Sequence, residues 1–124
     1  MILEFLNESL TVCKIKDAEN VDLSKDFTFL FKTDNEVSLV CRSCYVPEDT
    51  IGREDGWCAL RIAGKLDFSL IGIISGISKV LADNSIGLFV ISTFDTDYVL
   101  IKQTEKTNAI HALRSSGYVI EVAE

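Results

Sequence analysis

Apolar residues in the C-terminal half of the chain change their spacing several times. Alternation and short apolar runs predict strands, whereas recurrence at every third or fourth position predicts helices. The predicted elements are a strand at 58–63, a helix at 70–81, strands at 86–91 and 98–101, a helix at 105–115 and a strand at 118–122. Their order is therefore β-α-β-β-α-β.

This order predicts an α+β fold of the ferredoxin-like type, in which a four-stranded antiparallel sheet carries both helices on one face. In that arrangement the loop before the first helix (65–69) and the turn between the second and third strands (92–97) lie at the same end. We therefore expect the N-terminus of the first helix to face the residues of that turn. Asp67 or Ser69 is expected to cap the helix.

The N-terminal half has strand patterns at 10–15, 27–32 and 37–41, but its candidate helix at 17–25 is short and polar. The polar stretch 45–56, which contains the only proline, is interpreted as a linker. The predicted organisation is an N-terminal unit at 1–55, a reduced copy of the same fold with a weak helix, and a C-terminal domain at 56–124.

The sequence STFDTD at 92–97 concentrates polar residues between two apolar runs. Two interpretations are open: the side chains could cap the backbone of their own turn, or they could form the polar floor of a binding site. An α-amino acid is a zwitterion, so a helix N-terminus could bind its carboxylate. Asp97 could bind its ammonium group, or could pair with a cationic side chain. Asp95 is expected to be solvated.

Three glycines of the C-terminal half lie inside predicted helices or strands, where glycine is unfavourable. Gly72 and Gly76 each cost about 1 kcal/mol in a helix relative to alanine, so we expect them to permit close packing or access. Gly87, inside a predicted strand, is expected to mark a bulge or a close backbone approach.

The composition limits the classes of partner. The chain has 124 residues, 48% of them apolar, and a formal net charge of −7. An acidic surface disfavours nucleic acid and anionic membranes, and no apolar stretch is long enough to cross a bilayer. The N-terminus does not resemble a signal peptide. We expect a cytoplasmic protein.

The residues that could carry chemistry do not form a convincing set. Cys41 and Cys44 have CxxC spacing, but no second pair accompanies them, and the single histidine, His111, lies far along the chain. The four cysteines are therefore interpreted as packing residues, with no metal or other cofactor. Asp95 and Asp97 lack a converging base or nucleophile, so we expect no enzymatic activity.

Several segments resemble the ACT domains, which are small amino-acid-sensing regulatory domains, and more closely the short stand-alone bacterial proteins with tandem ACT domains. This group is related to aspartate kinase regulatory regions and CASTOR-type arginine sensors. The matching segments are 67–72 (DFSLIG), 85–89 (SIGLF) and 92–98 (STFDTDY), with 33–41 (TDNEVSLVC), Trp57 and Arg61 upstream.

The resemblance implies a ferredoxin-like fold, a homodimer and a small ligand, often an amino acid, bound at an ACT–ACT interface. In this family the ligand contacts come from the loop entering the first helix and the turn after the second strand. Carried over to this sequence, they are Phe68, Ser69, Leu70, Ile71, Gly72, Thr93, Phe94 and Asp97. The alternative function is a ligand-free dimeric module that regulates a partner protein by contact.

Overall fold

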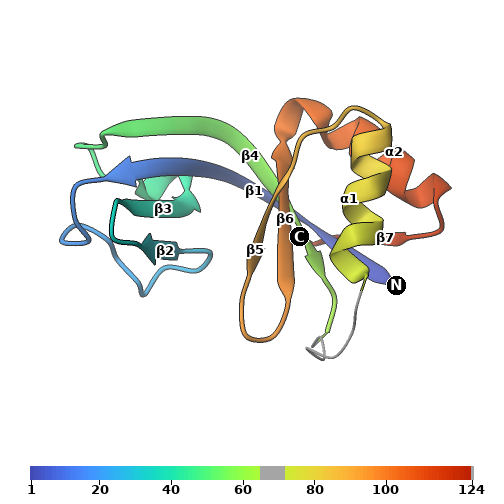
Figure 1. Ribbon diagram of the computed structural model, residues 1–124, viewed down its shortest axis with the longest axis horizontal. Coiled ribbons are helices and arrows are strands. Elements are labelled where there is room, and N and C mark those ends of the chain that lie inside the picture. The colour runs from blue at the N-terminus through green and yellow to red at the C-terminus, as the bar shows by residue number, and fades with distance from the viewer. Residues whose placement is uncertain (65–71, 124) are drawn as a thin grey trace. The chain divides into compact units, whose positions relative to one another are not determined.

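The computed structural model describes residues 1–64 and 72–123 and contains seven strands and two α-helices within them (Figure 1). It divides into two compact units. The helical unit comprises Met1–Asn7 and Cys58–Glu124, and the strand unit comprises Glu8–Trp57. The predicted division at residues 55 and 56 does not anticipate that Met1–Asn7 belong with the C-terminal residues.

The helical unit confirms the predicted order of elements. After the end of β4 (Gly52–Ile62) come α1 (Ile73–Asp83), β5 (Phe89–Ser92), β6 (Asp97–Lys102), the short 3-10 helix η2 (Gln103–Glu105), α2 (Lys106–Ser115) and β7 (Val119–Ala123). The strand order is β7-β1-β4-β6-β5, in which the first residues of β1 (Ile2–Ile15) lie between β7 and β4. The ferredoxin-like sheet therefore contains one additional strand.

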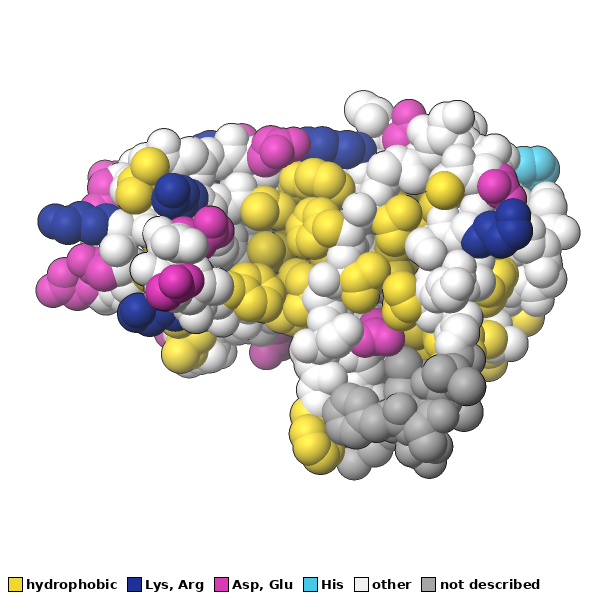
Figure 2. Space-filling model, viewed as in Figure 1, with side chains coloured by type: hydrophobic (Ala, Val, Ile, Leu, Met, Phe, Trp, Pro, Cys, Tyr) yellow, Lys and Arg dark blue, Asp and Glu magenta, His cyan; other side chains and the backbone are white. Residues whose placement is uncertain are grey.

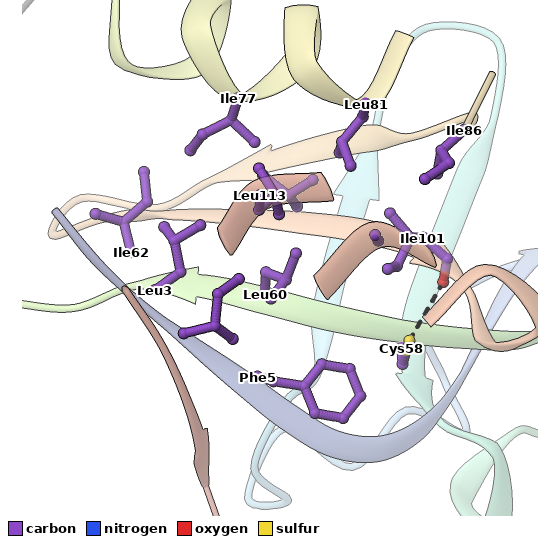
Figure 3. Packing of buried hydrophobic residues seen from close by; sticks show 13 residues of the cluster. Leu3, Phe5, Cys58, Leu60, Ile62, Ile77, Leu81, Ile86, Ile101 and Leu113 are labelled. Carbon is purple, nitrogen blue, oxygen red and sulfur yellow. Dashed lines mark hydrogen bonds between the residues drawn. The ribbon is translucent and has the colours of Figure 1, made fainter. Parts of the chain in front are cut away.

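A hydrophobic cluster packs the helices of this unit against the sheet (Figure 3). Its fully buried members come from the strands, α1, α2 and the connection to β5; those drawn and labelled in Figure 3 are Leu3, Phe5, Cys58, Leu60, Ile62, Ile77, Leu81, Ile86, Ile101 and Leu113. The Cys58 thiol also donates a weak hydrogen bond to the carbonyl of Ile101, at 3.6 Å. This packing fixes both helices on one face of the sheet, as predicted.

The glycines near α1 have different roles. Gly72 occupies the N-cap position with φ of 81°, in the left-handed region that favours glycine, while Asp67 and Ser69 lie outside the described residues. A Cβ on Gly76 would lie 2.9 Å from the Tyr118 hydroxyl, so this glycine permits close packing. Gly87 precedes β5, and a Cβ there would meet nothing within 4 Å, so the expected bulge or close approach is wrong.

The strand unit has the sheet order β2-β3-β1-β4, in which β2 (Phe29–Lys32) and β3 (Val37–Arg42) form a hairpin. The weak helix at 17–25 is absent; this segment forms turns, in which the Asp17 and Asp22 carboxylates accept backbone hydrogen bonds. The linker prediction is wrong for 52–56, because these residues belong to β4.

The two hairpins correspond closely, which supports the interpretation of the strand unit as a reduced copy. In each hairpin a four-residue strand, a four-residue turn and a six-residue strand are followed by a short 3-10 helix. The final strand pairs are Lys32↔Val37 in one and Ser92↔Asp97 in the other. Only the helical unit has α-helices within the described residues.

Candidate functional site

Some polar groups of the turn between β5 and β6 form hydrogen bonds within the turn and stabilise its conformation. The Thr93 backbone N–H donates to the Thr96 carbonyl at 2.8 Å, and the Thr93 hydroxyl donates to the same carbonyl at 3.0 Å. The Thr96 N–H donates back to the Thr93 hydroxyl at 3.3 Å. Thr33 has a similar role in the other hairpin, where its hydroxyl accepts the N–H of Glu36 at 3.2 Å. The Thr93 hydroxyl therefore acts as a cap within the turn.

Thr96 anchors this turn to the neighbouring strand. Its side chain is buried, and its hydroxyl donates a 2.9 Å hydrogen bond to the carbonyl of Ile62, the last residue of β4. Because α1 follows β4 along the chain, this bond ties the turn to the strand that leads toward the helix. Thr96 is absent from the predicted site residues, since no local pattern distinguishes a buried threonine from an exposed one in a polar turn.

Asp97 lies where the turn passes into β6. It pairs with Ser92 and is half-buried. Side chains alternate along a strand, and Val99 and Ile101 on β6 belong to the core beneath the helices. Asp97 is therefore on the helix-covered face of the sheet. In Figure 1, the end of the β5–β6 hairpin and the start of α1 lie at the same end of the helical unit, as predicted.

The start of α1 offers donors for an anion. The first backbone N–H groups of a helix have no partner within the helix, and the helix dipole makes this end favourable for negative charge. Gly72 supplies no side-chain cap, and the first turn contains no acidic residue. A carboxylate of a bound molecule could accept hydrogen bonds here, while the Asp97 carboxylate could accept them from an ammonium group.

The remaining predicted site residues fall into two groups. Phe94, at the turn, is 83% exposed. Four others in the loop before α1 lie outside the described residues: Phe68, Ser69, Leu70 and Ile71. Of the eight predicted residues, Gly72, Thr93 and Asp97 therefore have described positions that place polar groups at the proposed end of the unit, and the Thr93 hydroxyl is already bonded within its turn.

The cysteines differ in exposure. Cys44 is exposed, whereas Cys13, Cys41 and Cys58 are buried, and all four are free thiols. Burial raises the pKa of Cys41 and of Cys58 to about 11, so both remain protonated and unreactive near neutral pH. Among residues 1–64 and 72–123, no group of three or more potential ligands is arranged to hold a metal ion.

Three further observations concern possible ligands, nucleic acid and membranes. The strand unit has an open depression of about 230 Å³, lined by Val12, Cys13, Lys14, Gly52, Arg53 and Glu54, none of which is a predicted site residue. On the face shown in Figure 2, basic side chains stand singly or beside acidic ones, which is not the pattern of a nucleic-acid-binding surface. None of the described helices is long and apolar enough to cross a membrane.

A family model described as the ACT domain matches residues 52–115, from the start of β4 to the end of α2. The chain belongs to the ACT domain family. ACT domains are typically regulatory and non-catalytic, and the match supports a regulatory, ligand-binding role for this protein. No curated protein matches the sequence.

Solved structures extend the likeness over nearly all of this ACT-domain chain. The crystal structure of protein Atu0741 from Agobacterium tumefaciens has 28% identity and a TM-score of 0.88, covering 99% of this chain and 93% of that one. The regulatory subunit of aspartate kinase from Thermus thermophilus, in a ligand-free form, has 8% identity and a TM-score of 0.65, covering 93% and 96%. Protein VC0802 from Vibrio cholerae, of unknown function, has 17% identity and a TM-score of 0.71, covering 91% and 87%.

Proposed function

We propose that this ACT-domain protein is a regulatory protein that senses an α-amino acid. The observation that carries the proposal is the position of Asp97, on the helix-covered face of the sheet and at the end of the unit where α1 begins after Gly72, an N-cap residue that has no capping side chain. An anion-binding helix terminus and a carboxylate at one end match the two charges of a zwitterion.

The proposed site assigns a separate task to each residue. The N–H groups after Gly72 bind the ligand carboxylate, and Asp97 binds its ammonium group. Thr93 shapes the turn, and Phe94 covers the ligand and excludes water. Phe68, Ser69, Leu70 and Ile71 contribute from the loop before α1. Binding then stabilises an ACT–ACT interface, because a ligand that binds only the assembled state shifts the equilibrium toward it.

A thermal-shift screen of the twenty amino acids tests this function. A ligand at a hundred times its dissociation constant adds about 2.7 kcal/mol to the free energy of unfolding. We expect one class of amino acid to raise the midpoint by several degrees. Asp97→Ala should abolish the shift, whereas Asp95→Ala, which removes the same charge from an exposed turn position, should retain it. A shift that survives Asp97→Ala unchanged would rule out this site.

A second function is favoured by the turn itself. Its threonine hydroxyls are bonded to backbone carbonyls, and Phe94 is 83% exposed, as expected for a contact residue. A ligand-free dimeric module that regulates a partner protein by contact would have the same features. In that case no amino acid shifts the midpoint, and Phe94→Ala weakens binding to the partner.

The proposal includes a homodimer in the cytoplasm, with no nucleic acid or membrane partner. ACT domains often form dimers, and buried free thiols are suited to a reducing compartment. Sedimentation velocity tests the dimer, and cell fractionation tests the location.

A further inference from the structure

The strand β7 has one side that no described strand pairs with. It runs parallel to β1, from Ile2↔Val119 to Leu6↔Ala123, and β1 is its only neighbour in the described sheet. The Val119 N–H donates to the Met1 carbonyl at 3.1 Å. Successive residues of a strand direct their backbone groups to opposite sides, so the N–H and C=O groups of Ile120 and Val122 point away from β1.

The residues of this outer edge would favour pairing with another strand. Val119 is 52% exposed and Val122 is 55% exposed, so apolar side chains flank the edge on both faces of the sheet. The sequence of β7, VIEVA, contains no lysine and no proline, the residues that commonly protect an edge. Glu121 is its only charged residue. An exposed apolar edge of this type is a site for strand pairing between molecules.

Arg114 occupies this edge. It lies in the last turn of α2, and its Nη2 donates a 2.8 Å hydrogen bond to the Ile120 carbonyl. That carbonyl is an acceptor that an incoming strand would need for its first ladder bond. The guanidinium is positively charged, so its hydrogen bond to this carbonyl is charge-assisted and stronger than one from a backbone N–H. An incoming strand would have to break this bond before its own N–H could bind the carbonyl.

We propose that Arg114 closes the outer edge of β7 against pairing with a second copy of the chain. A second β7 is the natural partner, because two identical edges can pair antiparallel about a two-fold axis and satisfy each other's outward backbone groups. Exposed valines on each copy would meet across this pair. A dimer formed by the wild-type protein therefore uses a different surface.

Arg114→Met tests the proposal, since methionine keeps an aliphatic side chain but has no donor. Sedimentation velocity over a wide concentration range should show a rise of twofold or more in mass relative to the wild type, because each wild-type dimer would expose two β7 edges. Arg114→Lys, which keeps a charged donor, should sediment as the wild type. Adding Val122→Lys to Arg114→Met should restore the wild-type mass, because an exposed lysine protects an edge.

Hydrogen exchange gives a second readout that needs no variant. In the wild type, the amides of Ile120 and Val122 should exchange faster than those of Val119 and Glu121 at every protein concentration, because only the latter face β1. Slow exchange at Ile120 and Val122 would show that the edge is already paired and would overturn the proposal. The proposal would also be overturned if the Arg114→Met protein unfolds more easily but sediments as the wild type at all concentrations. In that case Arg114 would serve only to hold α2 against β7.

Discussion

Replacing Gly76 with alanine should test how tightly the first turns of α1 pack against Tyr118. In an unobstructed helix, alanine is favoured over glycine by about 0.8–1.0 kcal/mol. In this protein, the new Cβ would lie 2.9 Å from the Tyr118 hydroxyl, and Tyr118 packs against the core of the helical unit. Overpacking of this kind costs about 1–3 kcal/mol, so we expect Gly76→Ala to lower the free energy of unfolding by about 1 kcal/mol.

The effect of Gly76→Ala on the free energy of unfolding should change sign when the Tyr118 hydroxyl is removed. Tyr118→Phe deletes the hydroxyl, and in that background Gly76→Ala should raise the free energy of unfolding by about 1 kcal/mol. The two backgrounds therefore differ by about 2 kcal/mol, a coupling within the range found for residues in contact. Urea unfolding followed by circular dichroism of the four proteins measures each term. An equal effect of Gly76→Ala in both backgrounds would refute the reasoning.

Two further predictions concern the turn and the thiols. Thr96→Val should lower the free energy of unfolding by about 1–3 kcal/mol, because it leaves the buried Ile62 carbonyl without its 2.9 Å hydrogen bond. Thr107→Val, at an exposed helical position, is the control. An equal loss of stability in the control would contradict the role given to Thr96. With a thiol-reactive dye near neutral pH, Cys44 alone should react in the folded protein and all four cysteines after unfolding. The reaction should extend to Cys41 and Cys58 only as the pH approaches about 11, and fast labelling of either at neutral pH would contradict their burial.

Local patterns determined the order of elements in the helical unit. The change from alternation to helical spacing is a property of neighbouring residues, and it located β4, α1, β5, β6, α2 and β7, although β5 begins at Phe89 rather than at residue 86. The same order led to the ferredoxin-like fold, and the segments around α1 and the β5–β6 turn led to the ACT family, which the family match confirms.

Local patterns did not predict the first residues of the two long strands, β1 and β4. The start of β1 has Leu3, Phe5 and Leu6 buried on both faces of the sheet, so its residues do not alternate between apolar and polar. The start of β4 has the opposite character, because residues 52–55 are all exposed and their charges are typical of a loop. In both cases backbone pairing with distant residues, rather than side-chain periodicity, makes the strand.

The candidate site divides in the same way. The sequence by itself determined that a helix start and a polar turn share one end of the unit, because chain direction follows from the order of elements. Only the tertiary structure decided that Thr96 bonds to Ile62, that Gly76 makes room for Tyr118 and that Arg114 caps Ile120. Each of these contacts joins atoms from different elements, and their distances depend on how the elements pack, which no local spacing of residues specifies.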